Sequence, residues 1–252
     1  MFCGFIPLLV AIREVANPSW VNLEGSYSTL FRILKDFRVV PDLRHALFLL
    51  IIFVPFTMIA VLAVSLLLDA TPVRGNTLMR LIFILPGIAS GGISIMIWMY
   101  FLGSHISWDQ GNVQWLIAGI AFSSGAGSWI VIQYGSLRSI PHEVLEAARV
   151  DGCNRLQLAL RIKLPLIGRY IGYMAILLTA GAIQIYAEPA LLTSWGLTSN
   201  WWSLNQVAYS YAFQTADFAG GTALSLDMLL PSVIIGIIFV LRTDFLKRDA
   251  YQ

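Results

Sequence analysis

Residues 146–165 read Glu-Ala-Ala-Arg-Val-Asp-Gly-Cys-Asn-Arg-Leu-Gln-Leu-Ala-Leu-Arg-Ile-Lys-Leu-Pro, the longest charge-rich interruption in an otherwise apolar chain. Pro141 suits the first turn of a helix, and Gly152 can adopt the positive φ that ends one. The stretch therefore predicts two short helices outside the bilayer, placed between two hydrophobic spans. Such a loop would present a docking element to a partner, although an ordinary amphipathic hairpin on the membrane surface fits the same residues.

The composition predicts an all-α integral membrane protein with one helical domain. Of 252 residues, 58% are hydrophobic and 12% are charged, and the charged fraction is about half that of a soluble domain. The mean hydropathy is +0.75. The net charge of +2 is small and the basic residues fall in loops, so nucleic acid is a poor partner. Cys3 and Cys153 form no metal-ligand pattern, so no metal or cofactor is expected.

Five stretches with at most one charge come close to the length that crosses a bilayer, which takes roughly 20 apolar residues. These stretches are Ala46–Leu68, Leu81–Leu102, Val113–Gln133, Tyr170–Ala187 and Ala223–Leu241. Residues 1–12 are also apolar but would cover only about 18 Å as a helix, so a short or truncated first span is expected. We therefore expect an N-terminal hydrophobic segment and external linker (1–45), a transmembrane domain (46–241) and a tail (242–252).

The distribution of lysine and arginine predicts the orientation. Basic residues gather in 69–80, in 134–169 and in the tail, whereas 103–112 and 188–222 contain none. Because loops rich in Lys and Arg stay in the cytoplasm, the first set and the C-terminus are expected there. Segment 13–45 then lies outside despite five basic residues, which conflicts with the rule. Four acidic residues nearly balance them: Glu14, Glu24, Asp36 and Asp42.

The loop at 139–165 has its own local pattern. The first helix is expected over 142–151, with one face formed by Val144, Ala147, Ala148 and Asp151 at three- or four-residue spacing. Asn154 and Gln157 have the spacing of a capping box, which would start the second helix. That helix is expected to end at Pro165 and to carry one stripe formed by Leu156, Ala159, Leu160 and Lys163.

This loop resembles the EAA loop of permease subunits of binding-protein-dependent ABC importers. The family pattern is E-A-A, two residues, D-G-A, five residues, F, two residues, I, one residue and L-P. The matching residues are Glu146, Ala147, Ala148, Asp151, Gly152, Ile162, Leu164 and Pro165, preceded by a similar lead-in at 137–143. Cys153 and Ala159 depart from the pattern, and the missing aromatic at 159 suggests that docking differs there.

The resemblance covers about residues 20–245 and points to carbohydrate-type permeases. Residues 80–86 with Ile97 and Trp98 are similar to the third span of those proteins. Residues 185–193 are similar to the segment that precedes their outer loop, and residues within 209–225 are similar to the approach to their last span. At 194–196, Ser-Trp-Gly replaces the family's Gly-Gly-Pro, so we expect the shape of the outer loop and the sugar specificity to differ from the family's.

The resemblance implies a subunit that moves a sugar or sugar derivative across a bacterial or archaeal cytoplasmic membrane. Its partners would be a second homologous permease, an ATPase dimer that binds ATP and magnesium, an extracytoplasmic solute-binding protein and membrane lipid. The chain lacks a G-x-x-x-x-G-K-[ST] motif, so it would be no enzyme itself and a separate subunit would hydrolyse ATP. The ATPase-docking residues would be Val144, Glu146, Ala147, Ala148, Asp151, Gly152, Leu164 and Pro165.

Candidate substrate contacts combine aromatic faces with polar groups near spans. They are Trp98, Tyr186, Glu188 and Tyr209. Packing or interfacial solvation explains the same residues, because aromatic side chains gather at membrane interfaces. A non-sugar substrate (a phosphate ester, amino acid or peptide) is the main alternative. A secondary transporter would need an internal repeat, and none is evident. A membrane-embedded enzyme or a quinone or haem protein is disfavoured, because the three histidines lie in loops or at span ends.

Overall fold

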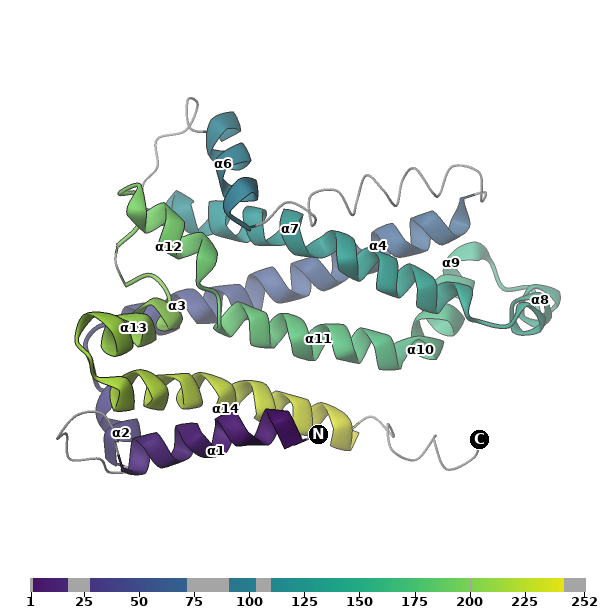
Figure 1. The fold of residues 1–252 in the computed structure, drawn as a ribbon. Helices are drawn as coiled ribbons and strands as arrows, with labels where there is room; N and C mark the ends of the chain where they lie inside the picture. The colour runs from purple at the N-terminus through teal and green to yellow at the C-terminus, as the bar shows by residue number, and fades with distance from the viewer. Residues whose placement is uncertain (1, 18–27, 72–90, 103–109, 200, 243–252) are drawn as a thin grey trace. The chain divides into compact units, whose positions relative to one another are not determined.

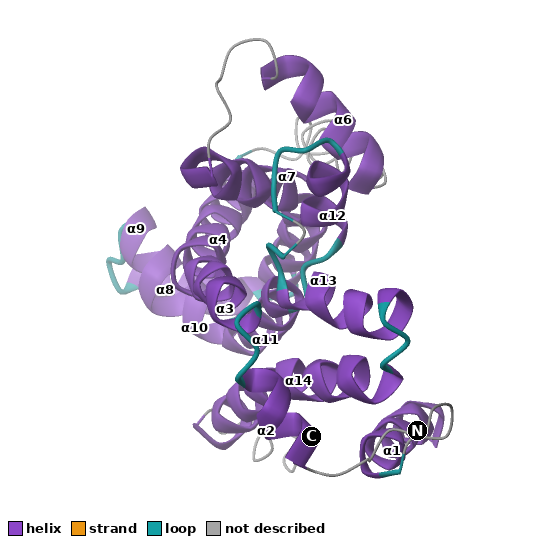
Figure 2. Cartoon of the chain, turned by 90° about the vertical axis from the view of Figure 1, so that its left-hand side faces the viewer, coloured by secondary structure: helices purple, strands orange, loops and turns teal. Residues whose placement is uncertain are grey.

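The computed structural model describes residues 2–17, 28–71, 91–102, 110–199 and 201–242, and every regular element in these ranges is a helix (Figure 2). Four of the described helical segments are long and apolar enough to cross a membrane. They are Val39–Ala70, Asn112–Arg138, Gly168–Ser194 and Phe218–Ile238. The predicted all-α membrane class is thereby confirmed. Of the predicted span at 81–102, the described part is helix α6 (Gly91–Leu102), and residues 81–90 lie outside the description.

The chain forms two compact units, and the first comprises residues 1–51, 108–115 and 179–243. Its helices are α1 (Phe2–Ala16), α2 (Ser28–Leu34), α3 (Val39–Phe48), α12 (Ala187–Ser194), α13 (Leu204–Tyr209), the π-helix η3 (Ser210–Gln214) and α14 (Phe218–Arg242). Helix α14 packs against α1, α2, α13 and η3 (Figure 1). Buried Val15, Val207 and Ala223 belong to the core of this unit. The short α1 is thus held by packing on the last long helix.

The start of α14 is built for close approach. Asp217 caps the helix, because Gly220 N–H donates to Asp217 Oδ1 at 2.8 Å. A Cβ on Gly221 would lie 2.9 Å from the carbonyl oxygen of Ala208 and 3.0 Å from Ala212 Cβ. Glycine therefore lets the backbones of α14 and α13 approach directly, as small residues do between membrane helices.

The second unit comprises residues 52–107, 116–178 and 244–252. It contains α4 (Val54–Ala70), α6, α8 (His142–Val150), α9 (Arg155–Gln157), the π-helix η2 (Leu158–Lys163) and α10 (Leu164–Leu166). Three helices continue from one unit to the other: the π-helix η1 (Leu49–Phe53), α7 (Gln110–Arg138) and α11 (Gly168–Ile183).

Polar side chains join the helices inside the second unit. Ser65 Oγ lies 2.7 Å from its own helix's Val61 carbonyl oxygen and 3.3 Å from that of Ile130. Gln133, which is fully buried, donates from Nε2 to the carbonyl oxygen of Tyr170 at 3.0 Å. Inside a membrane, packing apolar side chains together expels no water, so it provides little driving force for helix association. Hydrogen bonds between helices therefore help to hold them together. They fix α4, α7 and α11 around the place where the polar loop leaves the core.

Candidate functional site

The polar loop begins with helix α8, which ends as the sequence predicts. Gly152 has a φ of +81°. Cys153 N–H donates to the Ala148 carbonyl oxygen at 3.1 Å, and Gly152 N–H donates to that of Arg149 at 3.1 Å. This pair of bonds is the Schellman arrangement, which satisfies the last carbonyls of a helix and needs a left-handed residue. The predicted turn at Gly152 is confirmed.

The second helix starts with the predicted capping box. Gln157 N–H donates to Asn154 Oδ1 at 2.8 Å, and Asn154 N–H donates to Gln157 Oε1 at 3.0 Å. Both bonds satisfy backbone donors that a helix start leaves without partners. The turn from α8 into α9 is therefore fixed by hydrogen bonds at both of its ends.

Two leucines of the predicted stripe on the second helix are exposed to solvent. Leu158 is buried at 6% exposure, whereas Leu156 and Leu160 are 67% and 53% exposed. This stretch contains the π-helix η2, in which Leu164 N–H donates to the Ala159 carbonyl oxygen. The wider turn changes the three- and four-residue spacing on which the predicted stripe relied.

The second helical stretch ends one residue after Pro165, close to the predicted end. Helical turns continue through α10, Leu164–Leu166, before Ile167 leaves helical geometry with ψ of 11°. Proline lacks the N–H that donates a hydrogen bond in a regular helix. The π-helix just before it already departs from the regular hydrogen-bond pattern. The loop therefore reaches α11 as a nearly continuous helical connection.

Most of the predicted docking residues face away from the chain. Glu146, Ala147 and Asp151 are exposed, as are Val144, Gly152 and Pro165. Two members point inward: Ala148 is buried, and Leu164 packs on the core cluster of Leu137, Ile140 and Ile167. The predicted single face of α8 is thus divided, with Ala148 turned toward the chain.

Two features of this loop lay outside the sequence prediction. Val150 is 87% exposed at the end of α8, although it is apolar. Asp69, near the end of α4, forms ion pairs with Lys163 of η2 and, at 3.3 Å, with Arg138 Nε at the end of α7. The signal in the sequence was an acidic residue at the end of an uncharged span, which needs a cationic partner if it is buried.

The candidate substrate residues are only partly brought together. Tyr186 and Tyr209 lie with ring centroids 5.6 Å apart and line a pocket of about 190 Å³. Its polar lining residues are Thr193, Gln206, Ser210 and Gln214. Glu188 lies in the first turn of α12, after the break at 184–186, and does not line this pocket. Trp98 belongs to the second unit, where its Nε1 donates to Ser123 Oγ at 2.9 Å.

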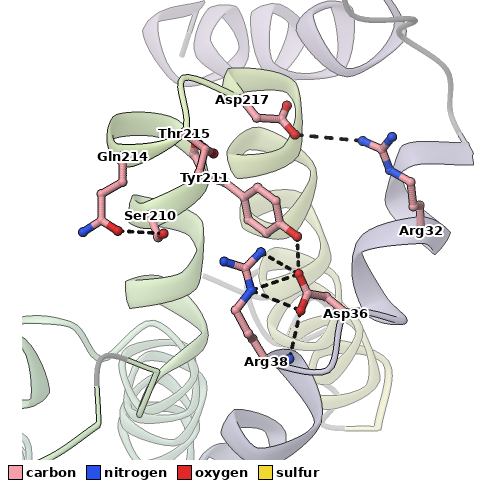
Figure 3. Close-up of polar contacts among 8 residues, drawn as sticks. All are labelled: Arg32, Asp36, Arg38, Ser210, Tyr211, Gln214, Thr215 and Asp217. Atoms are coloured by element: carbon pink, nitrogen blue, oxygen red, sulfur yellow. Dashed lines mark hydrogen bonds and ion pairs between the residues drawn. The ribbon is translucent and has the colours of Figure 1, made fainter.

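A charged cluster lies beside this pocket in the first unit (Figure 3). Arg38 donates from Nε and Nη2 to the Asp36 carboxylate at 2.6–3.1 Å, and Tyr211 O–H donates to the same group. The guanidinium lies 4.6 Å from the Tyr211 ring centroid and 5.0 Å from that of Trp201. The hydrogen bonds from Arg38 hold the pKa of Asp36 well below its ordinary value of 3.8. Burial, followed by the bond to Asp36, raises the pKa of Tyr211.

Comparison with known proteins gives one family match and several distant relatives. The family described as "Binding-protein-dependent transport system inner membrane component" matches residues 26–248. The multiple sugar-binding transport system permease protein MsmF of Streptococcus mutans is 28% identical over 49% of this chain and 42% of its own length. The probable ABC transporter permease YesP of Bacillus subtilis is 27% identical over 71% of this chain. The chain thus spans less than two thirds of both relatives, with 62% of YesP matched.

A third relative matches over most of its length. The probable starch degradation products permease AmyD of Thermoanaerobacterium thermosulfurigenes is 23% identical, covering 97% of this chain and 89% of AmyD. Among solved structures, a bacterial ABC transporter involved in alginate import superposes with a TM-score of 0.72 and 16% identity. That match covers 98% of this chain and 90% of the other chain. At this identity the structural likeness establishes the fold alone.

Proposed function

Because the chain belongs to the family of binding-protein-dependent transport system inner membrane components, we propose that it is the permease subunit of an ABC importer for a sugar or sugar derivative. In this role it is a transport subunit and no enzyme, and a partner ATPase binds ATP and magnesium. The observation that carries the proposal is the exposed two-helix loop at 139–165, tied to the ends of α4 and α7 by Asp69.

The loop has the properties that docking to an ATPase subunit requires. Glu146 and Asp151 are exposed carboxylates that can accept hydrogen bonds from basic or backbone donors. Ala147 is small enough for close approach, and Val144 and Val150 add exposed apolar surface. Gly152 sets the angle between α8 and α9. The ion pairs of Asp69 give a rigid route by which motion at the loop reaches the long helices.

The proposed orientation places this loop and the C-terminus in the cytoplasm, and segment 13–45 outside. The basic residues of that segment were the conflict with the positive-inside rule. Two of them are paired with acids: Arg38 with Asp36, and Arg32 with Asp217 at 3.9 Å. The orientation therefore rests on the other loops, where Lys and Arg gather in 69–80, 134–169 and the tail and are absent from 103–112 and 188–222.

A sugar is the proposed cargo because three observations favour it. The names of MsmF and AmyD refer to sugars or starch products, and the superposed transporter imports alginate. The pocket at Tyr186 and Tyr209 combines aromatic rings with amide and hydroxyl groups, the side chains that fit a sugar's C–H face and its hydroxyls. The proposed partners are a second homologous permease, an ATPase dimer and an external solute-binding protein.

Affinity purification followed by mass spectrometry tests the proposal directly. The wild-type chain should bring down an ATPase chain and a second permease. Glu146→Lys should lose the ATPase while keeping the second permease, because only the docking surface changes. Glu146→Gln, which removes the charge but keeps an acceptor, should lose less. Normal uptake with a retained ATPase in Glu146→Lys would refute the docking role.

Substrate contacts are tested separately by transport kinetics. Tyr209→Ala and Glu188→Ala should lower transport while the purified complex keeps its subunits. The matched control is Phe31→Ala, an exposed aromatic of the same unit outside the pocket at Tyr186. An unchanged KM and rate would remove the substituted residue from the pathway. Uptake of an amino acid, peptide or phosphate ester in place of sugars would replace the proposed cargo class.

A further inference from the structure

A second pocket in the first unit has no place in the transport role described above. Its volume is about 430 Å³, within the range of small-molecule sites. It is lined by Arg44, His45, Phe48, Val113, Gln114, Leu197, Thr198, Ser199 and Trp202. Arg44 and His45 lie on α3 immediately before the uncharged run that starts at Ala46, and Gln114 lies near the start of α7. The pocket is therefore at the polar end of two membrane spans.

The chemistry of the lining favours an anion. Among the residues that the structure describes, the lining holds a guanidinium and an imidazole and no carboxylate. Arg44 is exposed and forms no ion pair with any residue that the structure describes. The side chains of Gln114 and Ser199 add hydrogen-bond donors. A guanidinium with neighbouring amide and hydroxyl donors is the set of groups that binds phosphate oxygens.

The aromatic lining disfavours a sugar in this pocket. Trp202 is buried and stacks on the His45 ring at 4.6 Å with 8° between the planes. His45 Nδ1 lies 3.0 Å from the carbonyl oxygen of Trp202. Phe48 packs edge-on against Trp115 at 4.9 Å. The stacking with His45 occupies one face of the Trp202 ring, and the burial of Trp202 leaves little of that ring for a sugar to stack on.

Exposed apolar side chains lie on the elements that carry the basic end of this pocket. Leu47 and Ile51 follow Arg44 toward the membrane span, and Trp115 follows Gln114 on α7. All three are exposed in the described chain. A ligand that matches this order has an anionic head and an apolar tail. Arginine is well suited to binding phosphate groups, and a phosphate next to apolar chains is what a phospholipid headgroup presents.

We propose that this pocket binds the phosphodiester headgroup of a membrane phospholipid. Arg44 contacts the phosphate, with Gln114 and Ser199 as further donors, and the acyl chains lie along Leu47, Ile51 and Trp115. Inorganic phosphate has the same head chemistry and no tail, so it would occupy the pocket without the apolar contacts. The proposal needs the chain to lie in a membrane and does not depend on the identity of the cargo.

Native mass spectrometry of the full chain, purified with the subunits that accompany it, provides the test. Delipidated protein is titrated with phosphatidylglycerol, and separately with inorganic phosphate. Arg44→Gln should raise the lipid's Kd about tenfold, the size expected for losing one charge-assisted hydrogen bond. Arg44→Lys should restore part of the affinity. Lys35→Gln, which removes an exposed cation of the same unit that does not line the pocket, should leave the Kd unchanged.

A second variant tests the pocket independently of its charge. Ser199→Trp keeps Arg44 but fills the opening, so it should also weaken phosphatidylglycerol binding. Equal lipid affinity in wild type, Arg44→Gln and Ser199→Trp would overturn the proposal. If inorganic phosphate bound as tightly as phosphatidylglycerol, the pocket would be a site for a free anion and not for a lipid. If Lys35→Gln weakened lipid binding as much as Arg44→Gln, the effect would come from the protein's net charge and the pocket proposal would fail.

Discussion

Lys163 and Asp69 form an ion pair that ties the end of η2 to the end of α4, although 94 positions separate them in the chain. Both side chains are largely buried, with 14% and 10% of their surfaces exposed. Arg138 adds a second cation to the same carboxylate and donates from Nε to the Tyr134 hydroxyl at 2.9 Å. One acid therefore joins the polar loop to two long helices.

Removing the charge of Asp69 should loosen this junction. Asp69→Asn leaves Lys163 and Arg138 close together without an anion, and breaking a buried pair in this way costs on the order of 3 kcal/mol. We expect a lower Tm in detergent and faster proteolysis within 139–165. Thermal unfolding and limited proteolysis measure the two effects.

A double-mutant cycle of Asp69→Asn with Lys163→Met measures the interaction energy between these two side chains, apart from the destabilisation that each substitution causes by itself. The combined variant should be less destabilised than the sum of the two single variants, because the second change removes a charge that the first left unpaired. Strictly additive losses would show that the two side chains do not interact in solution.

Gly152 should tolerate side chains according to their backbone preferences. Space is not limiting, since nothing lies within 4 Å of an added Cβ, but the φ of +81° is unfavourable for other residues. Gly152→Ala should cost about 1–2 kcal/mol, and Gly152→Asn should cost less because asparagine adopts this conformation more readily. Thermal unfolding gives the order of the three proteins.

The matched control is Gly135→Ala. Gly135 also has nothing within 4 Å of its added Cβ, but it lies inside α7 without a positive φ. Alanine is the better helix former, so this variant should be neutral or slightly stabilising. Equal losses at both positions would contradict the role assigned to the turn at Gly152.

Gly221 is expected to be sensitive for the opposite reason, which is lack of space. Gly221→Ala places a Cβ 2.9 Å from the Ala208 carbonyl oxygen, so α14 must move away from α13. Overpacking of this kind costs about 1–3 kcal/mol. Gly119→Ala, where nothing lies within 4 Å, is the control. A Tm for Gly221→Ala equal to that of wild type would show that the two helices are farther apart.

The Asp36 cluster should make stability depend on pH at the acidic end. The pKa of Asp36 is lowered in the folded protein, chiefly by the hydrogen bonds from Arg38. Its contribution is therefore complete above the unfolded value of 3.8 and is lost as the pH falls further toward the folded pKa. Wild type should lose stability below about pH 4.

Asp36→Asn should remove this part of the pH dependence and lower stability at neutral pH, because Arg38 and Tyr211 lose a charged partner. Denaturant unfolding from pH 3 to pH 7 compares the two proteins, with the pH values set to bracket the ordinary carboxyl pKa. Parallel stability curves for wild type and Asp36→Asn would contradict the assignment.

Local features of the loop were predictable from the sequence because they depend on neighbouring residues. Gly152 is the residue that accepts a positive φ, and Asn154 with Gln157 has the spacing of a capping box. Both were confirmed. The π-helix within 158–163, which buries Leu158, was not predicted from the sequence. This π-helix lies just before Pro165. A proline removes a backbone hydrogen-bond donor and so affects the hydrogen bonds of the preceding helical turn.

The sequence by itself determined the membrane class, the regions of the spans and the position of the polar loop, since hydropathy and backbone preference act over short stretches. Only the tertiary structure decided which charges meet. Asp69 joins Lys163 and Arg138, and Tyr211 reaches Asp36 across 175 positions. The same holds for the pocket at Arg44, whose walls come from three separate segments. A buried charge needs a partner, but the sequence does not state which distant residue packing will bring to it.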